Sequence, residues 1–207
     1  MSKKEAEEPV WSCQPGPQTD AITAKWIATE LLFGGSRGGG KTDYLLGDFA
    51  QDVDKGRKWR GVIFRRSYPE LEDIIDRAKE IYDRAFPGAD FKETDAIFKF
   101  PGGATLKFRH LDRDSDADKH LGANYQWIGF DQLELWPTDT AYKKLIATLR
   151  SRHKSIPKRI RATANPGGVG TGWVKKRFID HAPAGRTLLR DKKSGMTRMF
   201  IPSRVTD

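Results

Sequence analysis

The stretch GGSRGGGKT, residues Gly34 to Thr42, decides the fold of this 207-residue chain. Within it, Gly35 to Thr42 satisfy the pattern G-x-x-x-x-G-K-[ST]. Glycines in such a loop let consecutive backbone N–H groups turn inward around phosphate oxygens, and the start of a following helix adds its partial positive charge. The residue types therefore predict a loop that cradles the phosphates of a nucleotide.

The residues on either side place this loop between a strand and a helix. Glu30 to Phe33 form a short apolar run typical of a buried strand, and a helical pattern runs from Lys41 to about Val53. In that setting Lys41 reaches the β and γ phosphates, and the Thr42 hydroxyl is a ligand of Mg²⁺. We predict that ATP is bound by Gly35, Ser36, Arg37, Gly38, Gly39, Gly40, Lys41 and Thr42; a flexible glycine loop that happens to precede Lys-Thr is the alternative.

Strands and helices alternate along the rest of the chain, which predicts a parallel sheet. Apolar runs indicate strands at 61–66, 125–130 and 159–164, and helical spacing predicts helices from Pro69 to about Pro87 and from Thr138 to about Arg152. The segments IFKF and ATLKF flank a Pro-Gly-Gly turn, and an exposed loop is expected over 111–118. The expected fold class is α/β: an ASCE-type P-loop NTPase with a mainly parallel central sheet flanked by helices and an added antiparallel hairpin over 91–110.

Two other strand ends carry polar residues suited to nucleotide chemistry. Asp131 is the only acid preceded by a good apolar strand, and such an acid is the second anchor for Mg²⁺ in P-loop folds; alternatively it caps the turn that follows. Asn165 ends the strand over 159–164 and can place an amide beside the γ-phosphate, although Asn165-Pro166-Gly167 is also an ordinary turn sequence.

The net charge of +9 is unevenly distributed. From Lys143 onward there are 17 Lys or Arg against 3 Asp or Glu, a net of +14, whereas residues 1–142 carry 20 against 25, a net of −5. The C-terminal third is a candidate surface for a polyanion, the alternative being a solvated basic face. The single cysteine, Cys13, excludes an internal disulfide, and no apolar run approaches the ~18 residues of a membrane helix, so we expect a reducing cytoplasm and no membrane contact.

Taken together, these segments resemble the N-terminal ATPase domain of the large terminase subunit of tailed bacteriophages, the motor that packages DNA. The resemblance rests on LLFGGSRGGGKTDYLL, VIFRRSYPELEDII, IFKFPGGATLKF, YQWIGFDQLELW, LRSR followed by RIRATANPGGVGTGWVKKRFI, and the late FIPSRVTD. These stretches occur in family order over nearly the whole chain after residue 14.

The resemblance implies an ATP hydrolase that uses Mg²⁺ and moves double-stranded DNA into a viral procapsid. It assigns Lys41 and Thr42 to the nucleotide and its metal and Asp131 to the Walker B position. It also assigns Thr163-Ala164-Asn165 to the motif that couples hydrolysis to movement, and Gln18 to recognition of adenine. The expected catalytic residues are Lys41, Asp131, Gln132 and Asn165.

The same resemblance implies a homo-oligomeric ring on a capsid, with a portal protein and a small terminase subunit as partners, in the cytoplasm of the host. A neighbouring subunit would supply an arginine to the transition state; Arg37, Arg150 and Arg152 are candidates, with ion pairing or DNA contact as the alternative for each. The basic segment Lys175-Lys176-Arg177 is expected to hold the DNA backbone without reading its sequence.

One residue departs from the family pattern. A glutamate follows the Walker B aspartate in the family, whereas this chain has Gln132. An amide can hydrogen-bond the attacking water but is no base, and loss of general-base help typically costs about 10² to 10⁴ in rate. We therefore expect ATP binding to survive and turnover to fall, and favour a deliberate Glu-to-Gln substitution over a natural variant. Glu134, two residues further on, is the alternative base.

The expected domain organisation is a tail and adenine-side segment over 1–20 and a P-loop ATPase domain over 21–207. Large terminases also carry a C-terminal nuclease with a cluster of metal-binding acids, and the three acids after residue 142 cannot form one. We expect the nuclease to be absent, either because the sequence is cut after the ATPase core, which we favour, or because it is a separate chain.

Two other functions stay open from the sequence. A helicase- or recombinase-like P-loop ATPase would stack on exposed bases, yet only Trp173 and Phe178 interleave with the basic residues, and these fit better as residues that pack a helix onto the core. A hydrolysis-deficient scaffold that binds nucleotide and DNA is favoured by Gln132. The four histidines show no spacing typical of metal ligands.

Overall fold

A computed structural model describes residues 9–204 of the chain, so the first eight residues of the expected tail lie outside the described residues. Within this range the strands join into one sheet. They are β1 (Glu30–Gly35), β2 (Arg60–Arg65), β3 (Asp90–Lys92), β4 (Ile97–Lys99), β5 (Thr105–His110), β6 (Trp127–Phe130), β7 (Arg159–Ala164), β8 (Leu189–Arg190) and β9 (Thr197–Ser203).

Helices follow most of these strands. The α-helices are α1 (Pro17–Thr23), α2 (Lys41–Ala50), α3 (Tyr68–Ala85), α4 (Thr140–Ile146) and α5 (Thr171–Phe178). Short 3₁₀ helices are η1 (Ala24–Trp26), η2 (Val53–Lys58), η3 (Glu93–Asp95), η4 (Asp114–His120) and η5 (Leu133–Leu135). In the described part of the chain, no helix is long and apolar enough to cross a bilayer.

The strand order is β3-β4-β5-β2-β6-β7-β1-β9-β8. All pairs from β5 to β9 are parallel, whereas β3, β4 and β8 are antiparallel additions at the two edges. Strand β7 lies between β1, which leads into the glycine-rich loop, and β6, which leads into Asp131. This is the order of an ASCE-type P-loop NTPase, and the expected fold class is confirmed.

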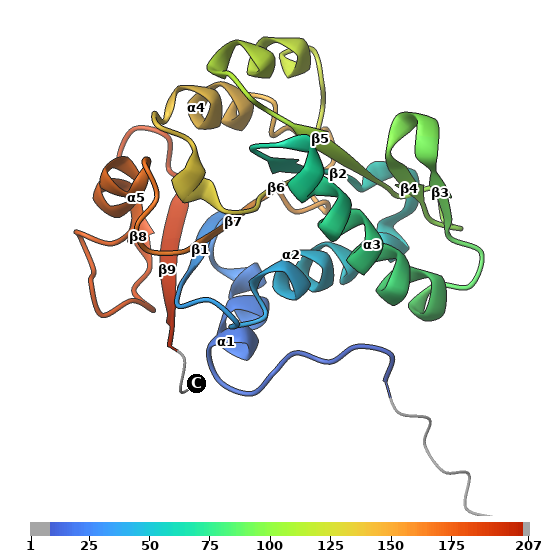
Figure 1. Cartoon of the computed structure of the whole chain (residues 1–207), viewed down its shortest axis with the longest axis horizontal. Helices are drawn as coiled ribbons and strands as arrows, with labels where there is room; N and C mark the ends of the chain where they lie inside the picture. Colours follow the sequence, from blue (N-terminus) through green and yellow to red (C-terminus); the bar gives the residue numbers. More distant parts are fainter. Residues whose placement is uncertain (1–8, 205–207) are drawn as a thin grey trace, which may run out of the picture.

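Both faces of the central strands β1, β2, β6 and β7 are buried, as expected for near-continuous apolar strands in a parallel sheet. Leu31 and Phe33 of β1 pack with α1, α2 and α3, whereas Leu32 packs with α4 and α5 on the opposite face. Figure 1 shows this arrangement, with α2 and α3 on one side of the strands and α4 and α5 on the other. The fold thus has three layers, with helices on both sides of the sheet. Because the central strands are parallel, the loops that lead from them into helices lie at one edge of the sheet.

Several expected boundaries are wrong, each for a local reason. Helix α2 ends at Ala50 rather than near Val53, where the 3₁₀ helix η2 begins. Helix α4 ends at Ile146, because the Thr148 hydroxyl bonds the Leu145 carbonyl (2.7 Å) and Leu149 then bridges to Tyr125 beside β6. The loop expected over 111–118 overlaps η4. The expected antiparallel hairpin is present, because β4 pairs antiparallel with both β3 and β5, although β5 also runs parallel to β2.

A buried cluster of charges joins α2 to the centre of the sheet. Asp48 of α2 is fully buried and accepts hydrogen bonds from the Arg161 guanidinium of β7 (2.9 Å) and the Trp127 indole of β6 (2.8 Å). One turn further, Asp52 lies 2.6 Å from the guanidinium of Arg159, also on β7. These contacts fix the helix that follows the glycine-rich loop against the two strands that end at Asp131 and Asn165.

We expect Asp48→Asn to lower the free energy of unfolding by about 3–5 kcal/mol, because the guanidinium of Arg161 then stays buried without a counter-charge. Urea unfolding followed by circular dichroism measures the loss. The control is Asp20→Asn, which removes the half-exposed pair with Arg186 and should cost less than about 1 kcal/mol. Equal losses in the two variants would contradict this role for Asp48.

Candidate nucleotide site

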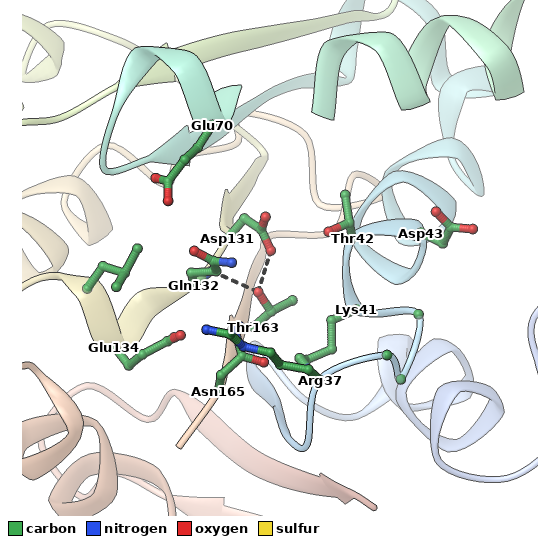
Figure 2. A pocket seen from close by; sticks show the side chains of 14 residues that line it. Arg37, Lys41, Thr42, Asp43, Glu70, Asp131, Gln132, Glu134, Thr163 and Asn165 are labelled. Atoms are coloured by element: carbon green, nitrogen blue, oxygen red, sulfur yellow. Dashed lines mark hydrogen bonds between the residues drawn. The ribbon is translucent and has the colours of Figure 1, made fainter. Parts of the chain in front are cut away.

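A cavity of about 510 Å³ opens at the edge where β1, β6 and β7 end. Loops leaving the carboxyl ends of parallel strands meet at one edge, which is where α/β sheets bind ligands. Figure 2 shows side chains from all three strand ends, and from the start of α3, around this space. Its lining includes Arg37, Gly38, Gly39, Gly40, Lys41, Thr42, Glu70, Asp131, Gln132, Glu134, Thr163 and Asn165.

The glycine-rich loop has the backbone that its sequence predicts. Gly35, Gly38 and Gly40 adopt positive φ angles of 141°, 85° and 62°. At Gly35 a Cβ would lie 1.9 Å from the Ser203 carbonyl oxygen of β9, so no other residue fits there. The backbone N–H groups of Gly38 to Gly40 donate no hydrogen bond to any described residue, and they remain available as donors for phosphate oxygens.

Lys41, the first residue of α2, turns its side chain back over this loop. Its ammonium donates to the carbonyl oxygens of Gly35 (3.3 Å) and Ser36. Burial lowers the pKa of Lys41, while the charges of Glu134 and Asp131 oppose the shift. The ammonium thus lies between the loop and the acids at the end of β6, where the terminal phosphates of a bound nucleotide would lie.

Asp131 is buried at the end of β6 and is held from two sides. Its Oδ1 accepts the Thr163 hydroxyl of β7 (2.5 Å), and its Oδ2 lies 3.2 Å from Nε of Arg65, at the end of β2. Burial raises the pKa of Asp131, whereas the charge of Arg65 lowers it. Oδ2 has no hydrogen-bond partner among the described residues, and neither has the hydroxyl of Thr42. These two oxygens at the rim of the phosphate loop suit a hard cation such as Mg²⁺.

Glu134 lines the same cavity, although the sequence gives it less weight than Gln132. It follows a sharp turn made by Gln132, whose φ of 58° is in the left-handed region, and this turn brings Glu134 back to the cavity. Its side chain points into the cavity near Asn165 in Figure 2, and its Oε2 is buried without a partner among the described residues. Burial raises the pKa of Glu134, against hydrogen bonds from Asn165. The left-handed turn, which sequence cannot reveal at a glutamine, explains the low weight.

Glu70 also faces the cavity and is not predicted from the sequence. It lies in the first turn of α3, accepts a hydrogen bond from the Ser67 hydroxyl (2.7 Å), and points toward Gln132 in Figure 2. The amide of Gln132 lines the same cavity, and its backbone N–H donates to the Thr163 hydroxyl (2.9 Å). The amide is therefore one of three side chains, with Glu70 and Glu134, that surround the space in front of Asp131.

The other predicted residues lie at different places. Gln18 is buried behind the glycine-rich loop, where its amide donates to the Gly40 carbonyl (2.8 Å) and accepts the Gln14 N–H (2.5 Å). Arg37 is exposed and lines the cavity of its own chain. The backbone N–H of Arg150 donates to the Tyr125 carbonyl, just before β6 begins. Arg150 therefore lies near the amino ends of the parallel strands, whereas the cavity lies at their carboxyl ends.

The expected DNA-binding segment is partly wrong. Arg177 of α5 donates to the buried carboxylate of Glu30 (2.7 and 3.0 Å), which also accepts the Tyr142 hydroxyl (2.9 Å). Its guanidinium is thus used inside the fold, where it and the guanidinium of Arg198 (3.6 Å) balance the buried charge of Glu30 at the start of β1. Lys175 and Lys176 remain exposed on the same helix.

A glycine-rich loop between β1 and α2, an acid at the end of β6, and β7 between these two strands together define a P-loop NTPase of the ASCE class. The family model described as "Terminase large subunit, T4likevirus-type, N-terminal" matches residues 32–176. That match covers more than half of the chain, and the chain belongs to this family.

Solved structures support the same fold. The large terminase of a thermophilic bacteriophage is similar with a TM-score of 0.69 and 15% identity, covering 94% of this chain and 47% of the terminase. The ATPase domain of the Thermus phage P74-26 large terminase has a TM-score of 0.65 and 18% identity, and the match covers 98% of this chain and 85% of that domain. The N-terminal domain of the phi29 DNA packaging ATPase has a TM-score of 0.63 and 15% identity, and the match covers 95% of this chain and 99% of that domain. This chain thus spans about half the length of the first of these terminases. No curated protein sequence matches it.

We expect Arg65→Met to lower the free energy of unfolding by roughly 3–5 kcal/mol near neutral pH, because Asp131 loses its buried cation partner. The loss should shrink in acid. A buried carboxyl with a raised pKa costs stability only while it is ionised, and protonated Asp131 needs no cation. Urea unfolding at pH 8 and pH 5 measures both effects.

The neighbouring Arg66 supplies the control for this substitution. It is partly exposed and donates only to the Leu111 carbonyl, at 3.4 Å, among the described residues. Arg66→Met should therefore cost less than about 1 kcal/mol and show no such dependence on pH. A loss in Arg65→Met that is small or independent of pH would contradict the pairing with Asp131.

Proposed function

We propose that this chain is the ATPase motor domain of a large terminase subunit, which hydrolyses ATP with Mg²⁺ and drives double-stranded DNA into a procapsid. The observation that carries the proposal is the cavity in which free loop N–H groups, Lys41, Asp131 and Glu134 meet. Related structures support it, since the large terminase of the thermophilic bacteriophage has been solved with ADP and with ATP-γ-S, and a chain of the phi29 packaging motor assembly has a similar fold.

The wider assignment follows from the family. The ATPase domain would cover 21–207, with the segment before it on the adenine side, and a nuclease domain would lie outside this sequence. A ring of copies would dock on the procapsid in the host cytoplasm, with a portal protein and a small terminase subunit as partners.

Within the cavity each side chain has a role. The N–H groups of Gly38 to Gly40 bind the phosphates, and Lys41 exchanges its loop carbonyls for the β and γ oxygens. Thr42 and Asp131 would hold Mg²⁺, which supplies neutralisation of the phosphate charge when bound. Asn165, which lines the cavity, would lie beside the terminal phosphate. Gln18 holds the Gly40 end of the loop in place and would contact adenine.

We assign the general base to Glu134. A base must be ionisable, close to the attacking water and poised near the working pH, and burial raises the pKa of Glu134 in that direction. Gln132 is neutral at any pH and can only orient the water. This assignment explains how a chain with glutamine at position 132 would still hydrolyse ATP. The scaffold alternative, favoured by Gln132 alone, is disfavoured by the buried carboxylate three residues after Asp131.

The segment 165–170 links this base to the strand end that senses the phosphate. Gly170 N–H donates to the Glu134 carbonyl (2.8 Å), and a Cβ at Gly168 would lie 2.5 Å from that same oxygen. A shift of Asn165 would therefore move Glu134, and α5, which begins at Thr171, would move with it. Through these contacts, the presence or loss of the terminal phosphate would change the position of α5, which carries Lys175 and Lys176.

We expect Glu134→Gln to lower kcat for ATP hydrolysis by about 10² to 10⁴ while nucleotide affinity changes less than about threefold, because only the base is lost. Gln132→Glu should change kcat less than about tenfold. Steady-state hydrolysis with and without duplex DNA, beside equilibrium binding of a fluorescent ATP analogue, separates the two effects. An unmodified chain that binds ATP without turnover, and that Gln132→Glu activates, would contradict the assignment. It would instead support the expectation from the sequence that Gln132 replaces the catalytic glutamate.

Contact with DNA is assigned to the exposed lysines of α5. Lys175 and Lys176 face solvent, and the carboxylate of Asp180 is 4.0 Å from the Lys175 ammonium. A motor that moves along any sequence needs phosphate contacts rather than base contacts. Each phosphate contact adds about 0.9 to the slope of log affinity against log salt.

We therefore expect the affinity for a blunt duplex to fall steeply with salt, and the double variant Lys175→Ala, Lys176→Ala to reduce that slope by about 2. Fluorescence anisotropy between roughly 50 and 200 mM salt measures it. The control is Lys92→Ala on the edge strand β3, which should leave the slope unchanged. An affinity that does not vary with salt would contradict DNA binding through phosphates.

A further inference from the structure

A second cavity, of about 400 Å³, lies apart from the nucleotide cavity. Its floor is the face of β5 that carries Lys107 and Arg109, and its wall is formed by η4 and the segment before β6. It shares no lining residue with the nucleotide cavity. Nothing in the proposed hydrolysis uses these side chains.

The cavity gathers positive charge. Lys107, Arg109 and Lys119 line it together with His110 and His120, against a single acid, Asp116. That acid is already paired, because it accepts the Lys119 ammonium (2.8 Å) and the Arg113 N–H (3.0 Å). The remaining cations are therefore not neutralised by the lining itself.

Lys107 and Arg109 differ from ordinary surface cations in their partners. Lys107 is half-buried and makes no hydrogen bond or ion pair with any described residue. Arg109 donates only to backbone carbonyls of the described chain, those of Asp95 (2.8 Å), Ala96 (3.4 Å) and Phe108 (2.6 Å), so its charge also lacks a carboxylate. Two cations two residues apart on one strand thus line the same cavity, and neither has a hydrogen bond or ion pair to a carboxylate of the described residues.

The pKa values of Lys107 and His120 reflect the same excess of positive charge. Burial lowers the pKa of Lys107, and the charges of Arg109 and Arg60 lower it further. Burial beside Arg109 and Lys107 also lowers the pKa of His120 to about 4. The His120 ring lines the wall of the cavity, where it packs edge-on against Phe64 and its Nδ1 lies 3.2 Å from the Tyr125 hydroxyl. An anion in the cavity would offset the repulsion that both groups experience.

The wall opposite β5 is fixed, so the cavity does not depend on a mobile loop. Helix η4 is tied to α4 and the segment before it at two points, where Asp114 accepts the Thr138 hydroxyl (2.7 Å) and Asp118 pairs with Lys144 (2.6 Å). The two remaining acids of η4, which could enter the cavity as counter-charges, are thus directed away from it. The fold keeps the hollow open and positive.

We propose that this cavity binds a phosphate group, either as a free small anion or as a phosphodiester of the DNA backbone. Lysine and arginine donors at the two sides of a half-enclosed space suit a tetrahedral oxyanion, and desolvation strengthens such charge-assisted hydrogen bonds. The site does not depend on ATP hydrolysis. If the phosphate belongs to DNA, the cavity is a second contact for the duplex besides α5.

The test reads the site through the ring signals of His120 in ¹H–¹⁵N NMR, since His120 lines this cavity and not the nucleotide cavity. The whole chain is titrated with inorganic phosphate, with a blunt DNA duplex, and with acetate at equal ionic strength. The variant is Lys107→Met, which removes a charge that has no partner among the described residues. The matched control is Lys99→Met on the adjacent strand β4, whose side chain is exposed outside the cavity.

We expect phosphate or duplex to shift the His120 signals, and the half-saturating concentration to rise about tenfold or more in Lys107→Met but not in Lys99→Met. Saturation by phosphate identifies a small-anion site, and a shift with duplex alone identifies a contact with the DNA backbone. Acetate as effective as phosphate, no shift with either ligand, or an unchanged titration in Lys107→Met would overturn the proposal. Thermal unfolding of both variants checks that the fold is retained.

Discussion

The carboxylate of Asp48 is the contact on which the geometry of the site depends. It lies in the last turn of α2, seven residues after Lys41, and it accepts hydrogen bonds from Arg161 of β7 and Trp127 of β6. A buried acid is stable only where donors surround it, so the helix can lie against these strands in one register alone. Together with the pairing of β7 with β1 and β6, this contact keeps the glycine-rich loop, Asp131 and Asn165 at their spacing.

The parts of the fold that the sequence predicts are those with a strong local signal. The loop before Lys41, the start of α3 beside Pro69 and the apolar run of β7 each combine a pattern with a turn or a cap. All three lie within one residue of where the sequence predicts them. Strand β9 is not predicted, because Arg198 and Pro202 interrupt its apolar pattern and its place beside β1 depends on residues 168 positions earlier in the chain. Pairing over such a distance leaves no local trace.

In the site, too, the residues with a local sequence signal are predicted, and those that depend on distant parts of the chain are not. Residues 37–42, Asp131 and Asn165 gather around one cavity, because strand ends of a parallel sheet share an edge. Arg65, Glu70 and Glu134 reach the surroundings of that cavity through a strand order and a left-handed turn that no short motif encodes. Arg177 shows the opposite error: its charge suggests a surface role, yet the buried Glu30 it neutralises lies 147 positions away in the sequence. Charge counts along a chain do not tell which cations the fold uses internally.

The position of β9 has a mechanical consequence. It runs parallel to β1 over six paired residues, from Glu30 opposite Arg198 to Gly35 opposite Ser203, and its last residue touches the phosphate loop through the Ser203 carbonyl and the Ser36 N–H (3.3 Å). Tension applied along β9 from its carboxyl end would load these backbone bonds in shear, all together, rather than peel them apart one at a time. The strand beside the nucleotide is thus attached in the geometry that resists pulling best, and a load carried by it would be felt first at the phosphate loop.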